Sequence, residues 1–154
     1  MMIMEKSQGK VTIQEYLGWT MWTVGFLIEV IADYQKDQFR RDPANKDKFI
    51  STGLWSLSRH PNYAGEIFLW FGLFVSASSS FTSWWQHLSI LSPTFVYLLI
   101  TKVSGIPLLE QYGLKKWGNM PDYQAYINQT PELFPSLMQL INWKWIEDQI
   151  CLQI

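Results

Sequence analysis

Residues 17–33 read LGWTMWTVGFLIEVIAD, an apolar run whose only charged side chains are Glu29 and Asp33. Extended to residues 16–34, the run comes close to the roughly 20 helical residues that cross the hydrocarbon core of a bilayer. Both acids lie near the end of the run, so most of its length is uncharged. The stretch therefore predicts a first transmembrane helix.

Two further apolar blocks follow. Residues 67–81 read IFLWFGLFVSASSSF and reach spanning length when extended to 64–85. A third block, residues 88–109, contains two prolines and a lysine, which a membrane helix tolerates when neighbouring helices satisfy the freed backbone groups. The alternative is a soluble bundle, because apolar runs shorter than about 18 residues can be buried core helices. The membrane reading predicts an all-α, polytopic bundle with about three transmembrane helices.

Composition supports one membrane domain over residues 1–154. Hydrophobic residues make up 48% of the chain and charged residues 16%, below the roughly 25% charged residues of typical soluble domains. The net charge of -1 gives no basic field that would attract nucleic acid. The single Cys151 excludes an intramolecular disulfide, and the first ten residues lack the features of a signal peptide.

Basic residues are unevenly distributed between the predicted loops. Segment 35–63 contains six Lys and Arg residues and the tail contains Lys115, Lys116 and Lys144, whereas the turn 83–87 contains none. Short cytoplasmic loops collect Lys and Arg, so 35–63 and 110–154 are predicted to be cytoplasmic, with short helices in the tail. The Asn128 glycosylation sequon would then lie on the cytoplasmic side.

Four charged residues form a stripe at the end of the first run. Glu29, Asp33, Lys36 and Arg40 are spaced four, three and four residues apart, which places them on one helix face. Ionisable groups inside an apolar helix indicate a functional site or an internal partner. One interpretation is a self-paired stripe that ends the span by snorkelling. The other is that the acids bind a polar ring while the bases bind phosphates, as a dinucleotide would require.

A second polar motif, SRHPNYAGE at residues 58–66, directly precedes the second apolar block. Pro61 stands where a helix would begin, because its missing N–H costs nothing there. Such an entry offers free backbone N–H groups to an anion, and Arg59 and His60 add donors and charge. Glu66 follows one turn later. Interfacial anchoring is the alternative interpretation of the same residues.

Several other kinds of site are excluded by motif. His60 and His87 have no Cys or acid at metal-ligand spacing, so no metal is predicted. The chain also contains no Gly-rich dinucleotide fingerprint, Walker loop or nucleophile elbow. Any cofactor must therefore bind by a different design.

QKDQFR at 35–40, GLW at 53–55 and SRHPNYAGE, in this order, resemble the C-terminal region of the steroid 5-alpha-reductase-like membrane proteins. The sterol C14-reductases share much of this pattern, which runs from about residue 29 to 135. The resemblance implies an NADPH pocket between membrane helices, open to the cytoplasm. It also implies hydride transfer to a carbon-carbon double bond of a steroid or other lipid, with the chemistry carried by the cofactor.

The resemblance also implies roles for individual residues. Lys36 and Arg40 would contact the phosphates, and Glu29 and Asp33 would lie near the nicotinamide carboxamide. No residue is predicted as a proton donor. The remaining residues implied to bind the cofactor are Trp55, Arg59, His60, Asn62, Tyr63, Glu66, Lys115, Lys116 and Tyr126.

Fuller members of that family have additional N-terminal membrane helices that form the substrate pocket. The chain is therefore interpreted as a truncated form, as one that needs a second chain to complete the pocket, or as one that has lost turnover. The expected partners are a lipid or steroid substrate and membrane lipids, without nucleic acid. The expected location is multi-pass in the endoplasmic reticulum of a eukaryote or the inner membrane of a bacterium.

Two other functions stay open. Isoprenylcysteine-type carboxyl methyltransferases carry a similar RHPxYxG turn, which binds S-adenosylmethionine. Lys36 and Arg40 favour the reductase, because two bases one turn apart suit a cofactor with several phosphates. The third alternative is a non-catalytic membrane protein that keeps the fold.

Overall fold

The computed structural model describes residues 11–135. Within them the chain is helical and contains no strand, which confirms the all-α prediction for this part. The predictions for the first ten residues, for Lys144 and Cys151 and for the end of the tail concern residues outside this range. In chain order the elements are α1 (Ile13–Arg41), the 3-10 turn η1 (Pro43–Asn45), α2 (Leu54–Leu57), α3 (Pro61–Ser78), the 3-10 turn η2 (Trp84–Ile90), α4 (Leu91–Leu98), the π-helical η3 (Leu99–Val103), α5 (Ile106–Trp117) and α6 (Pro121–Gln129).

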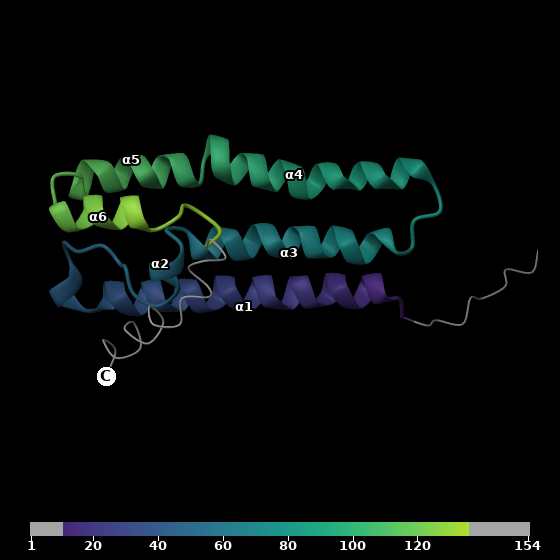
Figure 1. The fold of residues 1–154 in the computed structure, drawn as a ribbon, viewed down its shortest axis with the longest axis horizontal. Coiled ribbons are helices and arrows are strands. Elements are labelled where there is room, and N and C mark those ends of the chain that lie inside the picture. The colour runs from purple at the N-terminus through teal and green to yellow at the C-terminus, as the bar shows by residue number, and fades with distance from the viewer. Residues whose placement is uncertain (1–10, 136–154) are drawn as a thin grey trace, which may run out of the picture.

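Three long helical rods, α1, α3 and the stretch from α4 through η3 to α5, which is interrupted at residues 104–105, run side by side with alternating direction (Figure 1). The loop after α1, together with α2 and α6, gathers at the end of the bundle where α1 stops and α3 begins. The turn between α3 and η2 lies at the opposite end. Segment 35–63 and the end of α5, which carry the basic residues, therefore lie at the same end, here called the polar end.

One helix in the described part of the chain is long and apolar enough to cross a membrane, Trp84–Trp117, with a mean hydropathy of 1.4. It contains the predicted third span, 88–109. The predicted spans 16–34 and 64–85 correspond in position to α1 and α3. That these two helices also cross a membrane stays a prediction.

Helix boundaries differ from the predicted spans for local reasons. α1 continues through the charged stripe to Arg41, because Lys, Arg and Gln are good helix formers. α3 begins at Pro61, its first helical residue, as the motif predicted. It ends at Ser78 rather than at the predicted residue 85, because the serine-rich stretch at residues 76–80 favours turn conformations.

Glycines allow α1 and α3 to approach closely. A Cβ atom on Gly25 would lie 2.6 Å from the Gly65 carbonyl oxygen, and one on Gly65 would lie 2.6 Å from the Gly25 oxygen. Gly18 and Gly72 form a second close pair two turns away. Small residues at such crossings let helix backbones pack directly against each other. The crossing brings the charged stripe of α1 beside the start of α3.

α2 is fixed to α1 by side chains near the polar end. Gly53 turns the chain with φ of 60°, a conformation that favours glycine. The Leu54 backbone N–H then donates to Gln35 Oε1 at 2.9 Å, and Trp55 Nε1 donates to the Ala32 carbonyl oxygen at 3.0 Å. This anchoring places the Trp55 ring beside the last turns of α1.

Candidate functional site

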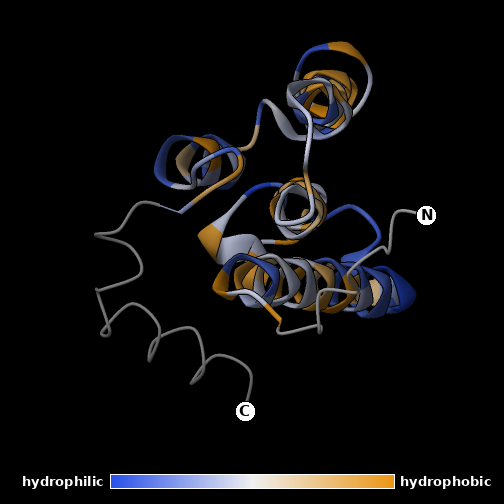
Figure 2. Ribbon diagram, turned by 90° about the vertical axis from the view of Figure 1, so that its right-hand side faces the viewer, coloured by the Kyte–Doolittle hydropathy of each residue, from blue (hydrophilic) through white to orange (hydrophobic). Residues whose placement is uncertain are grey.

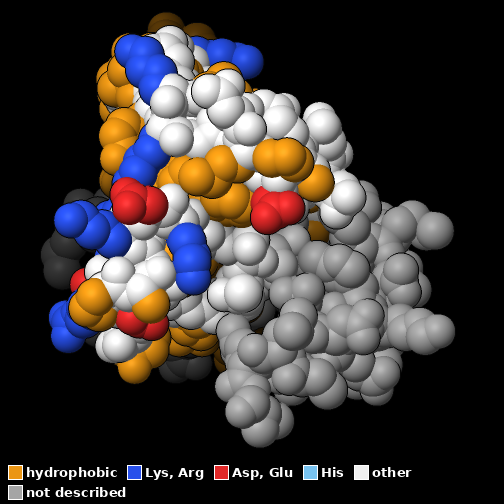
Figure 3. All heavy atoms as spheres, turned by 90° about the vertical axis from the view of Figure 1, so that its left-hand side faces the viewer, with side chains coloured by type: hydrophobic (Ala, Val, Ile, Leu, Met, Phe, Trp, Pro, Cys, Tyr) orange, Lys and Arg blue, Asp and Glu red, His pale blue; other side chains and the backbone are white. Residues whose placement is uncertain are grey.

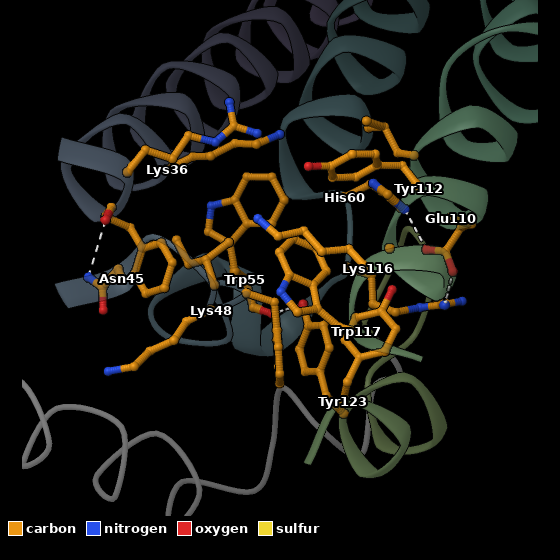
Figure 4. Close-up of a pocket in the computed structure, with 18 of the residues that line it drawn as sticks. Lys36, Asn45, Lys48, Trp55, His60, Glu110, Tyr112, Lys116, Trp117 and Tyr123 are labelled. Carbon is orange, nitrogen blue, oxygen red and sulfur yellow. Dashed lines mark hydrogen bonds and ion pairs between the residues drawn. The ribbon is translucent and has the colours of Figure 1, made fainter. Parts of the chain in front are cut away.

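A cavity of about 210 Å³ opens at the polar end, with walls from α1, the loop after it, α2, the start of α3, α5 and α6 (Figure 4). Figure 3 shows the same end, where Lys and Arg side chains lie beside exposed apolar ones. Glu110 is the acidic residue among the described lining residues. Six lining residues are basic: Lys36, Arg40, Lys46, Lys48, Arg59 and Lys116.

Lys36 and Arg40 lie one turn apart on α1 but in different surroundings. The Lys36 ammonium lies 4.8 Å from the centre of the Trp55 ring, within the range of a cation-π contact. Burial lowers the pKa of Lys36, and the positive charge of Arg40 lowers it further. Arg40 itself is exposed. The inner base is therefore the one that gains most from an anionic partner.

Aromatic rings form another part of the cavity wall. The Tyr126 hydroxyl donates to the Trp55 carbonyl oxygen at 2.6 Å, which joins α6 to α2. Burial raises the pKa of Tyr126, so this hydroxyl keeps its proton and acts as a donor. The Phe49 ring lies 5.0 Å from that of Tyr123 and 5.4 Å from that of Tyr126. These rings offer flat apolar surface to a ligand.

The loop after α1 is held across the cavity by the end of α5. Trp117 Nε1 donates to the Asp47 carbonyl oxygen at 2.7 Å, and Lys116 Nζ donates to the Lys46 carbonyl oxygen at 3.2 Å. These bonds pair backbone acceptors of the loop with side chains far along the chain. They keep the Lys46 and Lys48 side chains at the cavity.

The RHP turn at the start of α3 is tied to α5 by one carboxylate. Arg59 Nη1 lies 2.6 Å from Glu110 Oε2, and His60 Nε2 lies 2.8 Å from Glu110 Oε1 (Figure 4). The Arg59 backbone N–H donates to the Pro131 carbonyl oxygen at 2.9 Å, and Glu132 approaches its guanidinium at 3.8 Å. Among the described residues, Arg59 Nε and His60 Nδ1 are buried without a hydrogen-bond partner.

A second polar group lies next to the cavity, between α1 and α3. Asn62 Nδ2 donates to Asp33 Oδ1 at 3.0 Å. The carboxylates of Glu29, Asp33 and Glu66 are close enough to repel one another. The Tyr63 side chain is close enough to Asp33 and Glu66 to interact with their charges. These residues, with Asn62, are here called the acidic group. It begins one turn of α1 farther into the bundle than Lys36, at Asp33.

The structure thus divides the predicted site residues into sets. Glu29, Asp33, Asn62, Tyr63 and Glu66 make up the acidic group and do not line the cavity. Lys115 joins neither set, because at about 100° per residue it lies on the opposite side of α5 from Glu110, Gly113 and Trp117, which line the cavity. The predicted residues that line the cavity are Lys36, Arg40, Trp55, Arg59, His60, Lys116 and Tyr126.

Some lining residues were not predicted. Glu110 and Trp117 are seven residues apart on α5 and share a face with Gly113, so a face-by-face reading of that helix could have found them. Lys46, Lys48 and Phe49 lie in a loop, where no periodicity indicates direction. Within residues 11–135, no three His, Cys, Asp or Glu side chains come together in a way that could hold a metal ion.

Over residues 11–135, the fold and this site define an all-helical protein with one helix that could cross a membrane and a cationic, aromatic cavity at its polar end. Residues 1–130 match the family described as "Protein of unknown function (DUF1295)", and the chain belongs to that family. No solved structure matches the chain.

Two curated proteins are similar to it. The "Probable O-methyltransferase ustE" of Ustilaginoidea virens is 26% identical over 121 residues, which cover 72% of this chain and 37% of that protein. The "Probable 7-dehydrocholesterol reductase" of Acanthamoeba polyphaga mimivirus is 36% identical over 69 residues, covering 34% of this chain and 15% of that protein. The chain therefore spans well under half the length of either relative.

Proposed function

We propose that this chain binds NADPH in the cavity and contributes the cofactor site of a reductase acting on a carbon-carbon double bond of a steroid or other lipid. The observation that carries the proposal is the charge of the wall, whose described residues include six basic side chains and one carboxylate, that of Glu110. That carboxylate is already paired with Arg59 and His60. The free charge of the wall is therefore positive, as a ligand with several phosphates requires.

The residues present fit such a ligand in three respects. Lys36 is a partly buried base beside the Trp55 ring, and the aromatic rings offer stacking surface. Arg59 Nε is a buried donor without a partner among residues 11–135. The cavity of about 210 Å³ is smaller than the roughly 300–1,000 Å³ of typical ligand pockets, so it would hold the phosphate-bearing part.

The rest of the ligand would extend along the acidic group. Glu29 and Asp33 carry acceptor oxygens, which suit the amide donors of a carboxamide. Lys36 and Arg40 would hold the phosphates. Bound NADPH supplies a hydride to an electron-poor double bond, and the chain's own residues orient the cofactor. The order of phosphates and carboxamide along the ligand would then match the α1 stripe, which has its bases at the polar end and its acids farther into the bundle.

A membrane location supports a lipid substrate. Large apolar side chains of the long helices are exposed, for example Phe26, Leu27, Phe95 and Leu98. Figure 2 shows hydrophobic residues along all the long helices. Exposed apolar surface of this extent favours lipid contact over water. We propose a multi-pass membrane protein with its polar end in the cytoplasm, in the endoplasmic reticulum or a bacterial inner membrane. Because both relatives are much longer, a second chain or segment would complete the substrate pocket.

An S-adenosylmethionine-dependent methyltransferase is the second candidate. It is favoured by the relative named as a probable O-methyltransferase, whose match covers 72% of this chain. S-adenosylmethionine carries a positive sulfonium and no phosphate, so the basic wall would repel it more than it would attract it. The charge of the cavity therefore ranks the reductase first.

The deciding experiment measures binding of NADPH and of S-adenosylmethionine to the detergent-purified chain by quenching of tryptophan fluorescence. We expect saturable NADPH binding that is lost in the Lys36→Ala plus Arg40→Ala double variant. Tight S-adenosylmethionine binding without an NADPH signal would overturn the proposal. A separate assay would follow NADPH oxidation with enone lipids. NADPH binding without turnover would indicate either a missing second chain or a non-catalytic protein that retains the cofactor site.

A further inference from the structure

Glu110 differs from every other charged residue among the described lining of the cavity, because it is acidic. It comes from α5, far along the chain from its two partners. Its two oxygens serve different side chains. Oε2 accepts from Arg59 Nη1 at 2.6 Å, and Oε1 pairs with His60 Nε2 at 2.8 Å. One carboxylate therefore sets the orientation of both residues of the turn.

This pairing determines which nitrogen of His60 carries a proton. A carboxylate accepts hydrogen bonds, so the ring nitrogen that faces it must donate. When the imidazole is neutral, Nε2 holds the proton and Nδ1 is an acceptor. His60 is 6% exposed, and Nδ1 has no hydrogen-bond partner among the described residues.

Buried polar atoms in folded proteins almost always have a partner. Since His60 lines the cavity and its other nitrogen is taken by Glu110, a ligand is the candidate partner of Nδ1. The basic side chains of the wall can only donate hydrogen bonds. Nδ1 of His60 is an acceptor among these donors. Phosphate oxygens are also acceptors and have no proton to donate to Nδ1, so its partner must be a different group of the ligand.

We infer that Glu110 is a positioning residue of the cavity, which orients His60 so that Nδ1 accepts a hydrogen bond from a hydroxyl or amide donor of the bound ligand. The inference rests on the proposed function, because its test uses NADPH as the ligand. NADPH carries both hydroxyl and amide donors. The same carboxylate fixes Arg59 beside His60, so that a fixed donor and a fixed acceptor lie next to each other. Such a pair distinguishes a ribose hydroxyl of the ligand, next to the phosphates, from the phosphates themselves.

The test uses nitrogen NMR of the full chain in detergent micelles, labelled at histidine. The chain has two histidines, His60 and His87, so the spectrum contains one site of interest and one internal reference. In the neutral ring we expect a protonated Nε2 and a bare Nδ1 at His60. On addition of NADPH we expect the Nδ1 resonance of His60 to shift and both His87 resonances to stay in place.

Two variants separate positioning from general structural support. Glu110→Gln removes the charge that holds both partners, and we expect NADPH affinity to fall about tenfold, the size of one or two hydrogen bonds. Glu132→Gln is the matched control, because Glu132 approaches Arg59 at 3.8 Å and makes no contact with His60. It should leave both the affinity and the His60 spectrum unchanged.

Distinct outcomes separate this inference from the proposed function. NADPH binding that leaves Nδ1 unmoved, or a neutral His60 with its proton on Nδ1, overturns the role of Glu110 and leaves the cofactor assignment intact. Equal losses of NADPH affinity in the Glu110→Gln and Glu132→Gln variants also overturn the role of Glu110. A wild-type chain that binds no NADPH but shows the expected proton on Nε2 refutes the proposed function, while the pairing of Glu110 with His60 is upheld.

Discussion

Lys36 and Arg40 offer a sharp test of the cavity, because they are one turn apart on the same helix yet differ in burial. Lys36 is partly buried against Trp55, and burial lowers its pKa. Arg40 is exposed. If both bind phosphates of the same ligand, replacing each with Gln removes the same unit of charge from two different environments.

The expected losses follow from those environments. A hydrogen bond to a charged group in a partly buried site contributes about 1.5–3 kcal/mol, so Lys36→Gln should weaken NADPH binding by roughly 10- to 150-fold. An exposed ion pair contributes about 0.2–1 kcal/mol, so Arg40→Gln should weaken it by fivefold or less. The Arg40 effect should also shrink as salt is raised, because screening acts over about 10 Å at 0.1 M.

The assay is titration with NADPH, followed by quenching of tryptophan fluorescence, at low and at high salt. Arg41→Gln is the control, since Arg41 pairs with Asp37 at 2.8 Å, is 70% exposed and does not line the cavity. Its affinity should equal that of the wild type. Equal losses for Lys36 and Arg40, or a larger loss for Arg40, would refute the reasoning from burial.

Three further predictions concern the helix crossing, the α2 anchor and pH. Gly25→Val should destabilise the fold by about 1–3 kcal/mol, because its Cβ would lie 2.6 Å from the Gly65 carbonyl oxygen, and thermal unfolding in detergent measures this. Trp55→Phe should cost about 1–3 kcal/mol in the same assay, because the Ala32 carbonyl loses its 3.0 Å donor. NADPH affinity should fall with rising pH at values below the ordinary lysine pKa of about 10.4, because burial lowers the pKa of Lys36 and only its charged form attracts phosphate.

Each of these three has a matched control. Val24→Leu adds volume on α1 at a side chain that is 41% exposed, and Trp84→Phe removes an indole N–H that is on a 64% exposed ring. Neither should change the unfolding temperature noticeably, and a loss equal to that of the Gly25 or Trp55 variant would count against the packing argument. For the pH prediction, Lys36→Gln should flatten the decline of NADPH affinity with rising pH. If the decline is unchanged in that variant, a group other than Lys36 causes it.

Local patterns in the chain were sufficient for the helices and for part of the site. Apolar runs of near-spanning length predict α1, α3 and the third rod, and Pro61 predicts where α3 begins. These features depend on residues close in sequence, which is why they can be read without the fold. The same holds for the stripe from Glu29 to Arg40, since helical geometry alone places its members on one face.

Long-range packing decided the rest. The sequence gives no sign that Glu110 meets Arg59 and His60, because that contact depends on how α5 returns along α3. The Gly25–Gly65 crossing brings the stripe beside the RHP turn, and the loop bonds of Lys116 and Trp117 bring Lys46 and Lys48 to the cavity. Packing also splits the stripe between a basic cavity and an acidic group. Local sequence fixes which side chains share a helix face, whereas the distances between faces exist only once the helices have packed.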